Sequence, residues 1–370
     1  MKTSELDYDF DPSLVATAPA SPRDSARLML VDRAQGAITH HAVRDLPQLL
    51  RAGDQLFVNE TSVLRARLSL HDDARGRATE GLLLEPSAEP GVWRILVRQA
   101  KRFDAGDRLA LRDAHGRDHG DSIELIRRDA EAWLACFHAD SSASGDVATI
   151  LERSGLTPLP PYILKARRDR HEAIDDDDDR TEYETVYAQA SARGSVAAPT
   201  AGLHFTDGLL ASLAARGVGR SALTLHVGAG TFKPVEVDDL ADHPMHRESF
   251  SIAAPALDTL RSLAAARASG AARVVAIGTT TVRALESLPA DALSSAVHGS
   301  AISATTSILI SPGFRFRFTD ALLTNFHLPR STLLALVGAF AGMDLMREAY
   351  ATAVRERYRF YSYGDAMLIV

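Results

Sequence analysis

Two short segments combine small residues with one histidine and one phenylalanine, a composition typical of loops that face a ligand. Residues 195–206 read SVAAPTAGLHFT, and residues 225–232 read LHVGAGTF. Glycine lets a ligand approach the backbone closely, and a histidine can transfer a proton near neutral pH. The two segments therefore predict binding loops that carry two candidate proton carriers, His204 and His226.

A third candidate site is a turn that joins a predicted strand to a predicted helix. Residues 274–283 read VVAIGTTTVR, so Gly278 permits a tight turn and the predicted helix begins with three threonines. The positive end of a helix binds anions such as a carboxylate or a phosphate, and Arg283 adds a bidentate donor nearby. Simple capping of the helix by a threonine is the alternative interpretation.

A second strand-to-helix turn lies at residues 323–332, which read LTNFHLPRST. Asn325 and His327 fall between the strand and the helix, and Pro329 is expected to fix where that helix begins. A histidine packed in the core is one interpretation. The neighbouring asparagine, phenylalanine and arginine favour the wall of a pocket.

Metal and dinucleotide sites are poorly supported by the sequence. His243, His246 and Glu248 could ligate zinc, but the His-Glu-x-x-His arrangement and any cysteine cluster are missing, so acid–base or hydrogen-bonding roles are favoured. The glycines at 228 and 230 lack the third glycine of a dinucleotide fingerprint, and Pro234 follows where a helix would have to open. We expect neither a metal nor a Rossmann cofactor.

Composition narrows the class of protein. The chain has 370 residues, 46% hydrophobic and 24% charged, which suits a globular protein with a large core and room for two domains. It has no apolar run of membrane-spanning length, and its single cysteine, Cys136, fits a reducing cytoplasm. The net charge of −7 argues against an extended nucleic-acid footprint but allows local basic patches. We expect a cytoplasmic protein with no membrane contact and no obligate protein partner.

Hydrophobic periodicity changes along the chain and predicts a mixed α/β fold. Between residues 66 and 155, short segments of alternating polarity recur between turns, a pattern typical of a small antiparallel β-barrel. The remainder alternates strands and helices. We therefore predict an α/β main domain formed by residues 1–65 and 156–370, with a small β-barrel domain, residues 66–155, inserted near the N-terminal third. The acidic run 175–179 is predicted to be a solvated loop.

Ordered motifs along essentially the whole chain carry a family resemblance. They are LDYDF at 6–10, SPRDSARL at 21–28, AKR at 100–102, LPPYI at 159–163, YETVYA at 183–188, the two small-residue segments, GTT at 278–280, TNFHLP at 324–329 and YSYGDAM at 361–367. With these motifs the chain resembles the S-adenosylmethionine:tRNA ribosyltransferase-isomerase family. One departure is Ser62, because the family usually has an arginine there; here the nearest arginine is Arg65.

The resemblance implies a reaction and its substrates. The ribosyl moiety of S-adenosylmethionine is transferred to the 7-aminomethyl-7-deazaguanine wobble base of tRNA and isomerised, giving epoxyqueuosine, adenine and methionine. S-adenosylmethionine is thus a co-substrate, tRNA with a queuosine-precursor base is the partner, and no metal is required. A methyltransferase and a non-catalytic RNA-binding module are the alternatives. The first would need a glycine-rich turn near its start, and the second would leave the histidine-bearing loops unexplained.

Such a reaction needs groups that accept and donate protons, a cage of aromatic faces for the sulfonium, and cations for the RNA backbone. The candidate catalytic residues are His204, His226, His246 and His327. The candidate substrate-binding residues are Pro199, Thr200, Gly202, Phe205, Gly228, Gly230, Phe232, Gly278, Thr279, Thr280, Arg283, Asn325, Phe326, Tyr363 and Asp365. The candidate tRNA-binding residues are Lys101, Arg102, Lys165, Arg167 and Arg168.

Overall fold

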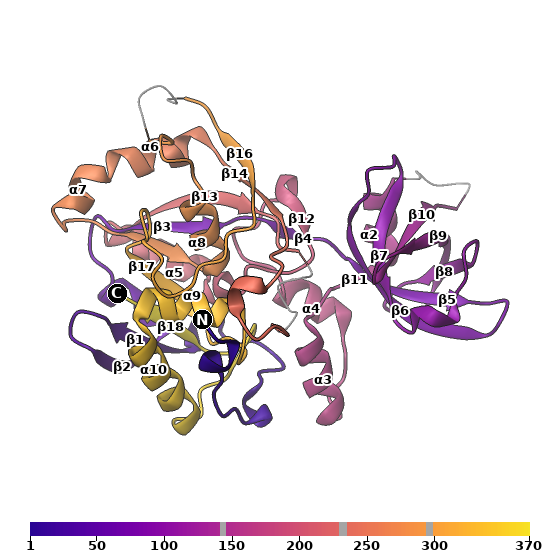
Figure 1. Cartoon of the computed structure of the whole chain (residues 1–370), viewed down its shortest axis with the longest axis horizontal. Coiled ribbons are helices and arrows are strands. Elements are labelled where there is room, and N and C mark those ends of the chain that lie inside the picture. Colours follow the sequence, from indigo (N-terminus) through magenta and orange to yellow (C-terminus); the bar gives the residue numbers. More distant parts are fainter. Residues whose placement is uncertain (141–145, 229–234, 294–298) are drawn as a thin grey trace.

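The chain forms two lobes of unequal size (Figure 1). The computed structural model describes residues 1–140, 146–228, 235–293 and 299–370. Strands β5 to β10 and helix α2 make the smaller lobe, and the segments before and after them make the larger one. No helix within the described ranges combines the length and the apolar character that a membrane crossing requires.

The larger lobe is built on a nine-stranded mixed sheet. In spatial order its strands are β16 (Ile302–Thr306), β14 (Glu248–Ile252), β13 (Gly219–Leu225), β3 (Gln55–Asn59), β15 (Val274–Ile277), β17 (Ala321–Asn325), β18 (Ala366–Ile369), β1 (Arg27–Asp32) and β2 (Ala37–Ala42). The four central strands β13, β3, β15 and β17 run parallel. All four residues of β15 are buried and apolar, as expected for a parallel strand covered on both faces.

Helices cover both faces of this sheet, which makes the larger lobe a mixed α/β structure. One face packs against α6 (Ala254–Ser262), α8 (Thr279–Glu286), α9 (Thr332–Ala341) and α10 (Met343–Arg355), and the short α7 (Ala264–Ala268) follows α6. The other face packs against α1 (Leu46–Leu49) and α5 (Asp207–Ala215). Val274 and Ala276 lie in the first core and Val275 and Ile277 in the second, because successive side chains of a strand point to opposite faces.

The smaller lobe consists of antiparallel strands around its own core. Its strands are β5 (Arg67–Asp72), β6 (Arg77–Pro86), β7 (Val92–Val97), β8 (Arg108–Arg112), β9 (Asp118–Asp129) and β10 (Ala132–His138), and β11 (Gly155–Leu156) joins β5 at one edge. The pairings run from β5 through β6, β7, β10, β9 and β8, and β8 also pairs with β5. Alternate residues such as Leu68 and Leu70 point into a core that α2 (Val147–Ser154) also covers.

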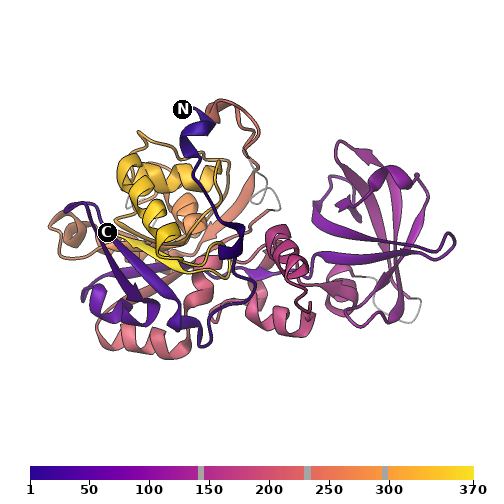
Figure 2. The same cartoon turned by 90° about the horizontal axis from the view of Figure 1, so that it is seen from below.

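Two short helices, α3 (Pro161–Asp169) and α4 (Asp176–Glu182), lie between the lobes (Figure 2), and β4 (Ser62–Val63) pairs nearby with β12 (Arg193–Ser195). The prediction of a solvated loop at 175–179 is wrong. Asp175 caps α4 by accepting hydrogen bonds from the amides of Asp177 and Asp178, and the carboxylate of Asp179 binds the buried guanidinium of Arg167. Acidic residues are favoured at the start of a helix because the helix dipole is positive there.

Candidate active site

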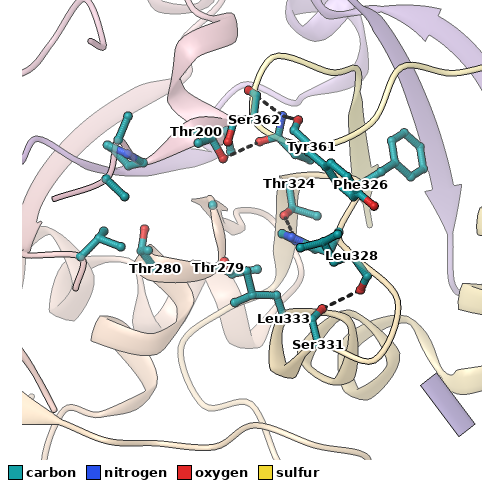
Figure 3. A pocket seen from close by; sticks show the side chains of 18 of the residues that line it. Thr200, Thr279, Thr280, Thr324, Phe326, Leu328, Ser331, Leu333, Tyr361 and Ser362 are labelled. Carbon is teal, nitrogen blue, oxygen red and sulfur yellow. Dashed lines mark hydrogen bonds between the residues drawn. The ribbon is translucent and has the colours of Figure 1, made fainter. Parts of the chain in front are cut away.

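A pocket lies at the carboxyl ends of β15 and β17, where parallel sheets commonly bind ligands. Four separate segments line it (Figure 3), and the residues involved are 197–201, 278–280, 324–328 and 361–362, together with Tyr162, Val227, Ser331 and Leu333. The predicted substrate-binding residues Pro199, Thr200, Gly278, Thr279, Thr280, Asn325 and Phe326 are among them. The sheet thus brings together loops that are far apart in the sequence.

Asn325 connects three of these segments. Its side-chain oxygen accepts a hydrogen bond from the hydroxyl of Thr200 at 3.0 Å, and its amide nitrogen donates to the carbonyl of Tyr361 at 3.1 Å. The same nitrogen donates to Nε2 of His204 at 3.2 Å. Because the side chain is only 2% exposed and fully engaged, Asn325 fixes the pocket wall and has little capacity left for a ligand.

His204 lies behind this wall and does not line the pocket. It ends the 3₁₀ turn η7 (Thr200–His204) and is 4% exposed. Burial, with a smaller contribution from Arg359 and Arg23, lowers its pKa to about 3. The imidazole is therefore neutral at pH 7 and accepts a hydrogen bond from the side-chain amide of Asn325, which makes His204 a positioning residue for the pocket.

His327 is the candidate proton carrier that lines the pocket. Its Nε2 shares a hydrogen bond of 2.8 Å with the hydroxyl of Thr324, and its backbone amide donates to the phenolic oxygen of Tyr350 at 2.9 Å. Burial lowers its pKa to about 3. His327 thus enters the pocket as a neutral imidazole held at a fixed orientation.

The start of α8 presents hydroxyl groups to the pocket. Gly278 occupies the N-cap position with φ +90, a conformation that favours glycine, so no side chain caps the helix. Thr281 is buried and bonds back to the carbonyl of Ile277, whereas Thr279 and Thr280 line the pocket (Figure 3). The capping alternative therefore does not account for these threonines, and the helix terminus is open to an anionic group.

Arg283 is placed differently from the prediction. It lies in the last turn of α8, is 6% exposed, and does not line the pocket. One of its terminal nitrogens donates to the buried carboxylate of Glu248, whose other oxygen accepts from the amide of Gly228 at 3.3 Å. Its Nε and other terminal nitrogen have no hydrogen-bond partner in the described part of the chain. The arginine thus supports the loop at 228 instead of contacting a ligand in this pocket.

His226, Gly228 and His246 border a different region, between the two lobes. His226 and Gly228 line a groove whose opposite wall comes from β6, β7 and α2 of the smaller lobe. The Nδ1 of His226 shares a hydrogen bond of 3.0 Å with the hydroxyl of Thr61, and burial lowers its pKa. His246 is exposed and lines an adjacent groove with Gly228. Val227 lines both the first groove and the pocket, so the two spaces adjoin.

Four other predicted substrate-binding residues are packed into the protein interior and do not line the pocket. Phe205 is fully buried in the core beneath α5. A Cβ at Gly202 would lie 2.1 Å from the phenolic oxygen of Tyr187, so this glycine serves packing. Tyr363 packs edge-on against Tyr183. Asp365 accepts hydrogen bonds from the amides of Arg27 and Arg359.

The predicted tRNA-binding residues divide by exposure. Lys101, Arg102, Lys165 and Arg168 are exposed. Arg167 is not, because its side chain is 7% exposed and donates to both oxygens of Asp179 and to the carbonyl of Thr17. A guanidinium so engaged cannot reach a phosphate, and the prediction for Arg167 is corrected accordingly.

Ser62, which stands where the family usually has an arginine, hydrogen-bonds the carboxylate of Glu184 at 2.9 Å. Arg65 does not replace the missing guanidinium, because it pairs with Glu152. Gly230 and Phe232 lie outside the described residues. Over the described ranges, no cluster of three or more histidine, cysteine, aspartate or glutamate residues is arranged to hold a metal ion.

Sequence reasoning missed several pocket residues, Tyr361 among them. Tyr162, Thr324 and Ser362 line the pocket, and the phenolic oxygen of Tyr162 hydrogen-bonds the hydroxyl of Ser362 at 2.5 Å. All three lie inside motifs that carry the family resemblance. A motif marks a segment as part of a functional site but does not show which of its side chains face the pocket. The individual residues therefore could not be selected from the sequence.

Comparison with known proteins agrees with this architecture. The family model described as "Queuosine biosynthesis protein" matches residues 3–369. The S-adenosylmethionine:tRNA ribosyltransferase-isomerase of Rhizorhabdus wittichii is 45% identical over 100% of this chain and 99% of its own length. The protein of the same name from Symbiobacterium thermophilum is 45% identical over 100% of both chains.

A solved structure is also similar. The crystal structure of S-adenosylmethionine tRNA ribosyltransferase from Thermotoga maritima is 33% identical, covers 99% of this chain and 100% of its own, and superposes with a TM-score of 0.52. The sequence matches extend over both lobes and all four pocket segments. The chain therefore belongs to the queuosine biosynthesis protein family.

Proposed function

We propose that the protein is an S-adenosylmethionine:tRNA ribosyltransferase-isomerase. It transfers the ribosyl moiety of S-adenosylmethionine to the 7-aminomethyl-7-deazaguanine wobble base of tRNA and releases adenine and methionine. Full-length similarity to proteins of that name supports the activity. S-adenosylmethionine is consumed as a co-substrate in this reaction.

The pocket at the carboxyl ends of β15 and β17 is the proposed S-adenosylmethionine site. The observation that carries this assignment is the combination of aromatic rings and a helix N-terminus around one space, since Tyr162, Phe326 and Tyr361 line it together with Thr279 and Thr280. Aromatic faces attract a sulfonium cation. Hydroxyls and amides at the start of α8 suit the carboxylate of the methionine portion.

The three histidines near the pocket are proposed to have different roles in proton transfer. His327 contacts the proposed pocket directly, but a pKa near 3 makes it a weak base, so a hydrogen-bonding role toward the departing adenine suits it better. His226 lies where the groove meets the pocket and is the proposed acceptor of the amine proton. His204 acts through Asn325 and touches no reacting atom.

The smaller lobe is proposed to be an inserted domain, residues 66–155, in a main domain of residues 1–65 and 156–370. Its ring of strand pairings is consistent with a small β-barrel, and its core is formed almost entirely by its own residues. Lys101 and Arg102 on this lobe, with Lys165 and Arg168 on α3, are the proposed phosphate contacts. In support, Arg168 lines a groove together with Arg98 of the smaller lobe.

The test is product analysis with purified protein, S-adenosylmethionine and tRNA that carries the precursor base. We expect adenine and methionine to appear in equal amounts, and only when both substrates are present. Omission of the precursor base should abolish adenine release. A methylated RNA would instead indicate a methyltransferase, and RNA binding without turnover would indicate a binding module.

A further inference from the structure

The groove that adjoins the pocket contains an aromatic surface with no assigned role. Trp93, in β7 of the smaller lobe, lines this groove opposite His226, and it is only partly buried. The chain has one other tryptophan, Trp133, which is 2% exposed in the lobe core with the guanidinium of Arg128 over its ring. Burial of Trp133 is explained by packing, whereas the indole of Trp93 borders open space.

The charges around Trp93 favour an anionic, planar ligand. Three described carboxylates line the groove. Glu85 and Glu248 are paired with Arg94 and Arg283, and Asp146 caps α2 by accepting a hydrogen bond from the amide of Ala148. Arg247, by contrast, donates to the hydroxyl of Thr305 at 3.1 Å and forms no ion pair with any described residue. A guanidinium without an ion pair and a partly exposed indole that line the same groove can bind a phosphate and its attached base.

The groove also leads to the proposed reaction site. Val227 lines both the groove and the pocket, and His226 precedes it on the groove side. A Cβ at Gly194 would lie 2.7 Å from the imidazole of His226, so the glycine allows the ring to pack against the backbone of β12. A base in this groove would thus lie against an oriented imidazole at the boundary of the pocket.

We propose that the groove binds an unpaired nucleobase of the tRNA loop, that the indole of Trp93 is its stacking surface, and that Arg247 holds the adjoining phosphate. This inference rests on the proposed function, because it takes tRNA as the substrate. It gives the smaller lobe a direct part in RNA recognition, through an aromatic contact in addition to the proposed contacts of its basic residues with the RNA phosphates. Unpaired loop bases are the parts of RNA that proteins recognise by stacking.

Fluorescence can test the stacking directly, because Trp133→Phe leaves Trp93 as the only tryptophan. The variant is titrated with an anticodon stem–loop RNA and, as a control, with a fully paired duplex of the same length. We expect saturable quenching by the stem–loop and little by the duplex at equal salt. The Trp93→Phe protein, which reports on Trp133 alone, should be quenched by neither. Equal quenching of Trp93 by both RNAs would overturn the proposal.

Steady-state kinetics tests the same contact in full-length protein without Trp133→Phe, in case that variant does not fold. Trp93→Leu should raise the KM for tRNA by about 5- to 150-fold, the loss of affinity expected when the stacking of one base is removed. The KM for S-adenosylmethionine and the kcat at saturating tRNA should each stay within about threefold of the wild-type value. Trp93→Phe should restore most of the tRNA affinity. An unchanged KM for tRNA in Trp93→Leu would contradict the proposal.

A second variant separates the phosphate contact from the stacking. Arg247→Gln should weaken binding of the stem–loop more than binding of the duplex, and it should lower the salt dependence of log K for the stem–loop by about one unit. An unchanged salt slope would remove Arg247 from the proposal. Failure of the proposed function is distinguishable, because it shows as wild-type protein that releases no adenine, whereas RNA quenching of Trp93 is measured without turnover.

Discussion

At the scale of single residues, burial decides what each histidine can do. The sequence placed four histidines in candidate ligand loops, but the structure assigns them different environments. His204 is buried and His327 is partly buried, and the pKa of each is lowered to about 3, so both are neutral hydrogen-bonding groups at pH 7. His226 lies at the junction of groove and pocket. His226 is therefore the proposed acceptor of the proton from the substrate amine.

The depressed pKa of His204 has a consequence for stability. The unfolded chain binds a proton at this position below its ordinary pKa near 6.5, whereas the folded protein does so only below about 3. Since the unfolded state binds more protons between these values, stability is lost as the pH falls from 6.5 toward 3. His204→Gln should therefore lose less stability than the wild type over this interval.

Urea unfolding of the wild type and His204→Gln at pH 7, 5.5 and 4.5 measures this effect. Glutamine keeps a group that can hydrogen-bond Asn325, so the variant should fold at pH 7. As the pH is lowered, the unfolding free energy of His204→Gln should increase relative to that of the wild type. Two profiles that stay parallel would show that His204 protonates in the folded state.

At the scale of elements, the segment between the lobes shows why charge runs are poor guides to structure. Five consecutive aspartates predict a solvated loop, yet Asp175 caps α4, and Asp176 and Asp179 are buried. Asp176 accepts a hydrogen bond from the amide of Thr157 at 2.8 Å, and Asp179 binds Arg167. The pairing partners come from elsewhere in the chain, so the run alone could not reveal them.

Arg167 and Arg168 are adjacent on α3 and provide a matched comparison. Arg167→Met should cost about 3–5 kcal/mol of stability, because it leaves the buried carboxylate of Asp179 without its partner. Arg168→Gln should change stability by less than about 0.5 kcal/mol but weaken tRNA binding and its salt dependence. Thermal unfolding and a salt titration of tRNA binding on both variants measure this. Weaker salt dependence in Arg167→Met alone would reverse the assignment.

At the scale of the whole molecule, the sequence predicted the mixed α/β class, and the structure confirms it. It also selected three of the four segments that meet at the pocket, because small residues and strand-to-helix turns have recognisable spacing. It could not separate ligand-facing from core side chains within a motif, as Phe205 and Asp365 show. Nor could it place Trp93 opposite His226, because that contact depends on how two lobes pack.

The proposed reaction carries the ribosyl carbons, and not the methyl group, of S-adenosylmethionine to the tRNA. It is tested most directly with two preparations of S-adenosylmethionine, one labelled in the ribosyl carbons and one in the methyl carbon. After reaction with precursor tRNA, mass analysis of the wobble nucleoside follows each label. We expect the ribosyl label to enter the nucleoside while the methyl label stays in the released methionine. Methyl label in the tRNA, or no ribosyl label there, would contradict it.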